Sequence, residues 1–283
     1  MKSKKYEFQS ILGLTLFTLL AANSFGAAWQ TIPGAGWVSV AAQSDGTALA
    51  TDVNGNVQRI NGSTASLVSA VGRQIGVASL VGATRYRVAG KGASVFVVDQ
   101  GGSATSGSIY QIDSATGAPA KLPGNAAVTQ VGPDGTAYAL SNGALYRSCV
   151  CARAGEAAGF KWMLLAVSGP NGDPLKSVSA GSAIWASTNS NAVMRWNSTT
   201  LTWDAMPALP AGTSILEISA ADDGTVAAIT ANWIYSLDLA ARGGPVWRQL
   251  SWSYSQTPFS NASASNANVF WAVNAKLQLM VYR

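Results

Sequence analysis

Short runs of alternating apolar and polar residues recur along most of the chain, and turn signals separate them. Val38–Val40 and Leu216–Ser219 change character at every residue, a period that places one side chain in the core and the next in water when the segment is a β-strand. Asp-Gly and Asn-Gly pairs lie between such runs and accept the positive φ angles of tight hairpin turns. They are Asp45–Gly46, Asn54–Gly55, Asp134–Gly135, Asn142–Gly143 and Asp223–Gly224. Only residues 152–159 could form a helical turn or two, so the pattern predicts an all-β protein.

The same order of strand and turn signals repeats six times along the chain. Leu49 and Arg59 are ten residues apart, as are Trp185 and Arg195, which supports a common register. The units cover residues 29–60, 67–112, 121–148, 162–197, 203–237 and 247–283, with a mean period of about 45 residues. Six units with four short strands each predict a six-bladed β-propeller that occupies residues 29–283 as a single domain. We expect the first and last strands to share one blade and so close the ring.

Residues 1–28 differ from the repeats and read as a secretory signal peptide. Three lysines lie within the first five residues, an apolar run covers Ile11–Ala22, and small residues follow up to Ala28. The apolar run is too short to cross roughly 30 Å of hydrocarbon as a helix. We therefore expect an exported protein, secreted or periplasmic, without membrane insertion. An uncleaved N-terminal anchor is the alternative.

Composition narrows the chemistry further. The 283 residues are 48% apolar and only 11% charged, and they include no histidine, which excludes Ser-His-Asp, Cys-His and histidine-ligated zinc mechanisms. Residues 29–283 carry 15 basic and 12 acidic residues, a net charge of about +3. This mild surplus forms no basic stripe and argues against a nucleic-acid partner. Neither a metal nor a cofactor is expected. Cys149 and Cys151 form a lone C-x-C pair, which leaves a disulfide and free thiols open as alternatives.

The repeat resembles a known family. Its best copies read WQTIPGAGWVSVAAQSDGT, GPDGTAYALSNGALYR and FWAVNAKL, and they are similar to the tectonin repeat of six-bladed propeller lectins. The opening tryptophans Trp29, Trp162, Trp203 and Trp247 match the repeat, whereas the third unit has Lys121 in that place. The resemblance covers residues 29–283 and implies carbohydrate binding at surface sites of the propeller. It does not nominate a sugar.

Ten tryptophans supply the candidate binding residues. Six of them recur in register, and such residues most simply fill the space between neighbouring blades; they are Trp29, Trp162, Trp185, Trp203, Trp247 and Trp271. The remaining four tryptophans fall outside these two columns, and Tyr254 shares a strand face with one of them. The predicted ligand-binding residues are therefore Trp37, Trp196, Trp233, Trp252 and Tyr254.

These observations lead to a non-catalytic, exported lectin that binds cell-surface glycans through several weak sites. Two alternatives stay open. The first is a structural or protein-binding propeller that has no sugar sites. The second is a glycan hydrolase, which needs two converging carboxylates. The carboxylates outside the turns that would be suspected first are Glu156, Asp173, Asp204 and Glu217.

Overall fold

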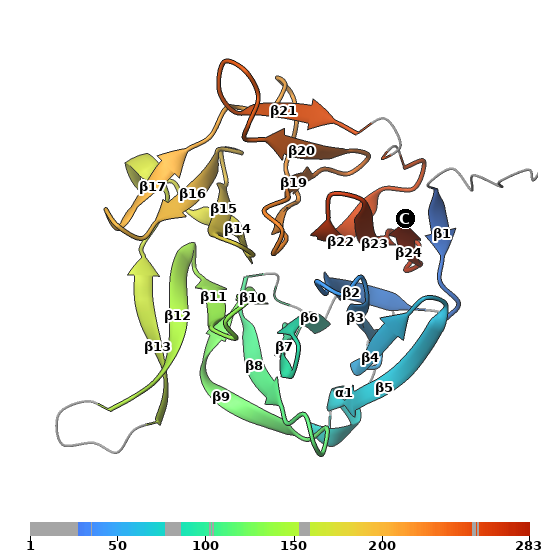
Figure 1. Ribbon diagram of the computed structural model, residues 1–283. Helices are drawn as coiled ribbons and strands as arrows, with labels where there is room; N and C mark the ends of the chain where they lie inside the picture. The colour runs from blue at the N-terminus through green and yellow to red at the C-terminus, as the bar shows by residue number, and fades with distance from the viewer. Residues whose placement is uncertain are drawn as a thin grey trace, which may run out of the picture.

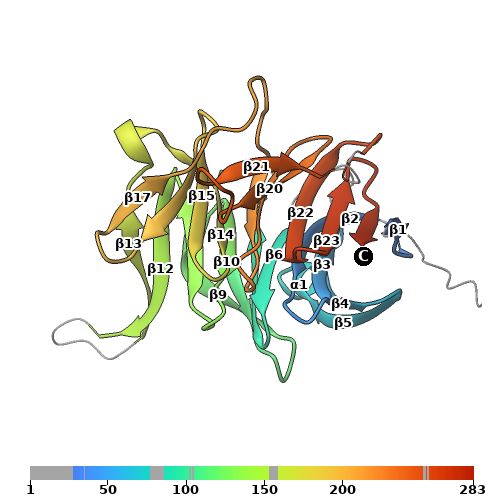
Figure 2. The ribbon, with the colours of Figure 1, turned by 45° about the horizontal axis from the view of Figure 1, so that its top comes forward.

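Six four-stranded antiparallel sheets stand around one central axis and form a closed ring (Figures 1 and 2). The computed structural model describes residues 28–34, 36–76, 86–101, 103, 105–152, 159–250, 253 and 255–283. The predicted six-bladed all-β propeller is confirmed. Besides strands, the described part of the chain holds two short helical segments, α1 (Val71–Gln74) and η1 (Pro170–Gly172). No helix within it is long and apolar enough to span a bilayer.

In blades 1 to 5 the four strands follow one another along the chain from the axis outward, and in blade 6 the three inner strands do so. The innermost strands of blades 1 to 6 are β2 (Trp37–Ala42), β6 (Tyr86–Lys91), β10 (Val128–Val131), β14 (Leu175–Ala180), β18 (Glu217–Ala220) and β22 (Phe259–Asn266). The second strands are β3 (Ala48–Asp52), β7 (Ser94–Asp99), β11 (Ala137–Ser141), β15 (Ile184–Thr188), β19 (Val226–Ile229) and β23 (Val269–Asn274). The third strands are β4 (Asn56–Asn61), β8 (Gly107–Ile112), β12 (Ala144–Cys151), β16 (Val193–Asn197), β20 (Ile234–Asp238) and β24 (Leu279–Tyr282). The outermost strands are β5 (Thr64–Ala70), β9 (Pro119–Ala126), β13 (Gly159–Ala166), β17 (Thr202–Ala205), β21 (Val246–Gln249) and, in blade 6, β1 (Trp29–Thr31).

The predicted Asp-Gly turns connect the first two strands of blades 1, 3 and 5. In blade 1 the Asp45 carboxylate accepts hydrogen bonds from the backbone N–H of Thr47 at 2.9 Å and from its hydroxyl at 2.6 Å. Gly46 adopts φ +83°, a left-handed conformation that glycine reaches without steric cost. The hydrogen bonds from Thr47 lower the pKa of Asp45. The acidic residue of this turn therefore serves local geometry.

The ring closes through strands from the two ends of the sequence. Strand β1 pairs antiparallel with β24, and Trp29 lies opposite Tyr282. The expected sharing of one blade by the first and last strands is thus confirmed. Each sequence repeat consequently begins on the outermost strand of one blade and continues into the first three strands of the next, because its opening tryptophan lies on β1, β13, β17 or β21.

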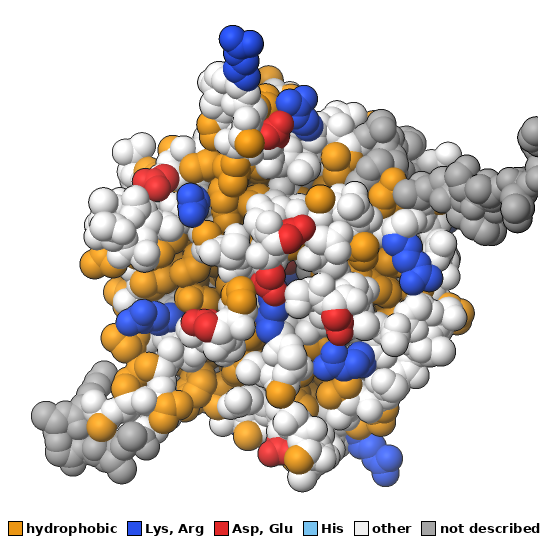
Figure 3. Space-filling model, viewed as in Figure 1, with side chains coloured by type: hydrophobic (Ala, Val, Ile, Leu, Met, Phe, Trp, Pro, Cys, Tyr) orange, Lys and Arg blue, Asp and Glu red, His pale blue; other side chains and the backbone are white. Residues whose placement is uncertain are grey.

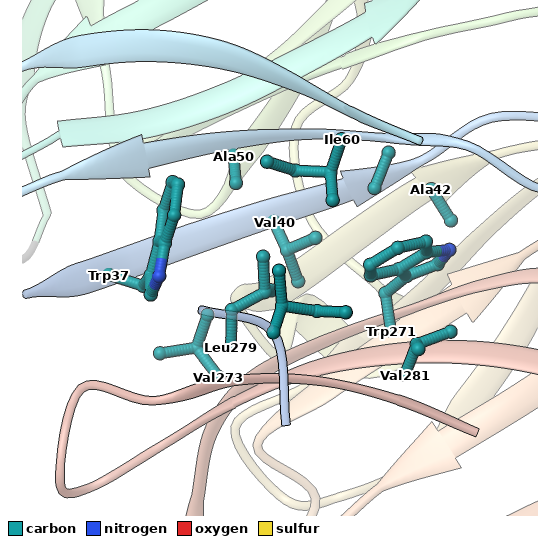
Figure 4. Close-up of a cluster of buried hydrophobic side chains, with 11 residues drawn as sticks. Trp37, Val40, Ala42, Ala50, Ile60, Trp271, Val273, Leu279 and Val281 are labelled. Carbon is teal, nitrogen blue, oxygen red and sulfur yellow. The ribbon is translucent and has the colours of Figure 1, made fainter. Parts of the chain in front are cut away.

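The hydrophobic core lies between neighbouring blades, which pack face to face. Figure 4 shows the cluster between blades 6 and 1, where Trp271 and Leu279 meet Val40 and Ile60. The opening tryptophans lie further out and join successive blades: the Nε1–H groups of Trp203 and Trp247 donate to the carbonyl oxygens of Ser168 and Pro207, at 3.1 and 2.8 Å. The expected packing of recurring tryptophans between neighbouring blades is therefore confirmed for Trp203, Trp247 and Trp271.

The two cysteines form a disulfide within β12, so one of the two open alternatives is realised in the structure. The Cα atoms of Cys149 and Cys151 are 5.4 Å apart, within the range that a disulfide can bridge. This separation is shorter than that between alternate residues of a fully extended strand. Both residues nevertheless stay in the strand and pair with β13.

Candidate functional site

The five predicted ligand-binding residues do not form one site among the described residues. Trp37 is 2% exposed and packs inside the cluster between blades 6 and 1 (Figure 4). Trp233 is half-buried between β19 and β20 in blade 5 and packs against the core shared with blade 4. Trp196 lies on β16 of blade 4. Trp252 and Tyr254 lie outside the described residues.

Trp37 is buried although the sequence pattern predicts a surface position for it. It falls outside the two recurring columns, which makes it a candidate for the surface on sequence grounds. Its indole instead fills one end of the buried cluster, next to Ala50 and Val273 (Figure 4). A fully buried ring offers no face for a sugar to stack on.

Trp196 is the predicted residue that borders a large surface depression, which we call the blade 3–4 groove. The groove has a volume of about 590 Å³ and is lined by residues 164–170, 196 and 201–203. Trp196 itself is 9% exposed. Its ring meets that of Trp203 edge to face, with centroids 5.1 Å apart and planes inclined by 73°. The two residues lie opposite each other on β16 and β17 of blade 4 and form one wall of the groove.

Exposed apolar side chains make up the rest of this groove. Leu164, Val167 and Leu201 are 54%, 70% and 67% exposed. Leu201 lies in the turn between β16 and β17 and has φ +55°, a left-handed conformation that is uncommon for a bulky residue. Apolar side chains also gather over blades 3 and 4 in the space-filling view (Figure 3). No sequence pattern indicates this groove, because its lining residues come from two blades.

A second candidate site is the channel along the axis. All six innermost strands line an inner chamber of about 20 Å³, room for about one water molecule. A wider vestibule of about 80 Å³ lies where the innermost strands of blades 2 to 5 begin and is lined by Arg87, Lys176 and Glu217 among others. At the other end Lys91 of blade 2 forms a salt bridge with Asp222 of blade 5. These blades face each other across the ring, so this ion pair crosses the channel mouth.

Glu217 is the buried carboxylate of this channel. Its Oε2 accepts a hydrogen bond of 2.6 Å from the Asn261 side-chain amide, and the backbone N–H of Ala262 donates to it as well. Burial raises the pKa of Glu217, while the charge of Arg87 and the two hydrogen bonds act against this rise.

Replacing Glu217 with glutamine is expected to change the pH dependence of stability. The folded state holds the Glu217 proton more tightly than the unfolded chain, whose carboxyl has a pKa near 4.5, so this residue makes stability fall as pH rises above that value. The amide introduced by Glu217→Gln keeps an acceptor for Asn261 and Ala262 but cannot ionise. Melting temperatures measured from pH 4 to 8 should show the variant gaining on the wild-type protein, by a few degrees at the upper end. An unchanged difference across the series would contradict the prediction.

The other carboxylates considered for catalysis are separated from Glu217. Asp173 lies in the link before β14, and hydrogen bonds from Ser190 and then Thr188 lower its pKa. Asp204 lies on the outermost strand β17, where the Asn197 side chain donates to it at 3.2 Å. Glu156 lies outside the described residues. The structure therefore brings no two of the three described candidates into one site.

Sequence comparison finds no match: no protein-family model and no curated protein matches the chain. Solved structures match through their folds. The β-propeller domain of Cps50 (Swd1) from Myceliophteria thermophila has a TM-score of 0.57 at 10% identity, over 89% of this chain and 98% of that one. The structure of YCF48 bound to a D1 peptide has a TM-score of 0.51 at 14% identity, over 90% of this chain and 81% of that one. Streptogramin B lyase has a TM-score of 0.53 at 14% identity, over 91% of this chain and 87% of that one.

These similarities are too distant in sequence to carry a function to this chain. One of the three structures holds a bound peptide and another is a lyase, so the same fold serves different purposes. The propeller implied by the tectonin resemblance is confirmed, whereas membership of the tectonin family is not shown. The function must be argued from the surface of this chain.

Proposed function

We propose that this protein is an exported, non-catalytic propeller that binds an extended, apolar segment of a protein partner in the blade 3–4 groove. The observation that carries the proposal is the lining of the groove: three side chains more than half exposed, Leu164, Val167 and Leu201, beside the Trp196–Trp203 pair. None of the described lining residues is charged. Exposed apolar surface of this kind favours a macromolecular partner.

The neighbouring strand supports an extended partner. β13 is the outermost strand of blade 3 and pairs with β12 on one side only. It is eight residues long, and Met163 and Leu164 on it are 43% and 54% exposed. A long apolar edge strand can pair with a strand of another chain, whose main chain then forms hydrogen bonds while its side chains enter adjacent depressions. The YCF48 structure provides a precedent for a peptide bound to this fold.

Selection from a display library of short peptides tests this function. The wild-type protein should enrich peptides that alternate apolar side chains, and a Leu164→Ser or Leu201→Ser variant should bind them at least about tenfold more weakly. Leu67→Ser is the matched control, because Leu67 is 64% exposed on the outermost strand of blade 1. Enrichment of no peptide, or equal weakening by Leu67→Ser, would contradict the proposal.

Glycan binding is the second candidate, and the Trp196–Trp203 pair is the observation that favours it. Aromatic rings provide the apolar platform on which sugar rings stack, and Trp203 is half-buried at the groove. A glycan array probed with the wild-type protein and with Trp196→Ala tests this candidate. Binding to one glycan class that Trp196→Ala abolishes would favour a lectin over a peptide-binding propeller.

A further inference from the structure

Side chains of the innermost strands join neighbouring blades at four junctions of the ring, and blades 2 and 3 depart from this pattern. In blade 1 the Ser39 hydroxyl accepts the backbone N–H of Val88 in blade 2, at 3.2 Å. Ser177 of blade 4 accepts the N–H of Ile218 in blade 5, at 3.0 Å. At these junctions the inner edge of one blade offers an N–H group that the preceding blade satisfies with a side-chain acceptor.

The same rule continues through blades 5 and 6. Glu217 accepts the N–H of Ala262, and Asn261 accepts the N–H of Val40 at 2.6 Å, which returns the ring to blade 1. The position in blade 2 that corresponds to Glu217 and Asn261 is Arg87, the residue before Val88. A guanidinium group only donates hydrogen bonds. Arg87 therefore cannot accept a backbone N–H from the next blade, as the equivalent side chains of blades 1, 4, 5 and 6 do.

Arg87 is instead available to a ligand. It borders both the inner chamber and the vestibule, it is partly exposed, and no hydrogen bond or salt bridge joins its guanidinium to the described residues. The corresponding position in blade 3 is Val128, because Val128 and Glu217 each lie six residues before the aspartate of their turn. Its apolar side chain borders the vestibule and offers Arg87 no hydrogen-bond partner. Lys176 of blade 4 borders the same vestibule and is partly exposed. The space between these two cations is therefore open.

We infer that the vestibule binds the carboxylate group of a ligand between Arg87 and Lys176. Arg87 and Lys176 contribute two positive charges and Glu217 one negative charge, so the surplus of one matches a singly charged carboxylate better than a doubly charged phosphate. A volume of about 80 Å³ accommodates a carboxylate with its first carbon atoms. The Lys91–Asp222 ion pair crosses the opposite mouth, which leaves the vestibule as the entrance.

Glu217 already has hydrogen-bond donors of its own. The Asn261 side-chain amide and the Ala262 N–H both donate to its carboxylate, so Glu217 does not need the Arg87 guanidinium as a hydrogen-bond partner. The inference is independent of the proposed function, since the blade 3–4 groove and the vestibule have no lining residue in common among those described.

Calorimetry and thermal melting with two probes test this inference. Acetate represents a free carboxylate, and a tripeptide with a free C-terminus, compared with its C-terminal amide, represents a peptide end. At least one probe should bind and raise the melting temperature, and both Arg87→Met and Lys176→Met should weaken that binding at least about tenfold. Binding of acetate indicates a small free ligand, and binding of the peptide acid alone indicates a chain terminus; either supports the inference.

Two controls make a negative result informative. Arg242→Met removes an exposed arginine between β20 and β21 and should leave carboxylate binding unchanged. Leu164→Ser should also leave it unchanged, although this variant is expected to lose peptide binding in the groove. The inference is overturned if neither carboxylate binds, if phosphate binds more tightly than both, or if the Arg87 and Lys176 variants bind as well as Arg242→Met.

Discussion

A chain that lacks residues 29–32 should melt more than about 10 °C below the full propeller. Strand β1 supplies the outermost strand of blade 6, and the Ile32 N–H donates to the Leu279 carbonyl oxygen at 2.8 Å. Ile32 is 3% exposed in the cluster between blades 6 and 1, and loss of one such side chain alone costs about 2–5 kcal/mol. Each kcal/mol corresponds to about 2–4 °C in a domain of this size.

The deletion acts where strands from opposite ends of the chain pair without a connecting hairpin. Trp29 contacts Phe259 and Tyr282, with ring centroids 5.5 and 5.8 Å away, so the deletion also removes an aromatic contact. Calorimetry of a chain that begins at Ala28 provides the reference, and a chain that begins at Pro33 is the test. Equal melting temperatures for the two would show that β1 contributes nothing to closing the ring.

The second large effect is expected for Trp271→Ala, which should destabilise the protein by about 3–5 kcal/mol. Trp271 is 1% exposed, packs between blades 6 and 1, and donates from its Nε1–H to the Gly46 carbonyl oxygen at 3.2 Å. Alanine leaves a cavity and removes the donor to the carbonyl oxygen at the turn of the next blade. The corresponding fall in melting temperature is about 10 °C.

Two further variants test whether the loss of stability depends on the side-chain volume removed and on how deeply the tryptophan is buried. Trp271→Phe retains most of the ring and loses the hydrogen bond, so its cost should be smaller than that of Trp271→Ala. Trp233→Ala removes a half-buried indole at the edge of the blade 4–5 cluster and should cost less than Trp271→Ala. Chemical denaturation measures all three free energies of unfolding. Equal losses for Trp271→Ala and Trp233→Ala would contradict the prediction.

The fold was predictable because its signals are local. The Asp-Gly turns, the period-two strands and the repeat of about 45 residues each lie within a short stretch of chain. The recurrence of Trp203 and Trp247 likewise indicated their place between blades, as their hydrogen bonds to Ser168 and Pro207 show. Ring closure followed from the strand patterns at the two ends.

The candidate sites were less predictable because they combine distant residues. Leu164 and Leu201 line one groove from different blades. Arg87 and Glu217 line the same vestibule although 130 residues separate them in the chain. The burial of Trp37 was hard to predict for a related reason. The sequence shows that Trp37 lies outside the recurring tryptophan columns, but its burial depends on side chains that the neighbouring blade supplies. The pattern of strands carries no information about these combinations.

The ion pair between Lys91 and Asp222 affects how solutes exchange at the axis of the propeller. A tunnel open at both ends would let one solute enter while another leaves, whereas the Lys91–Asp222 pair narrows the far mouth of this passage. Incoming and outgoing molecules must then use the same opening. Exchange would then be limited by departure of the previous occupant of the vestibule, because the inner chamber beyond it has room for about one water molecule.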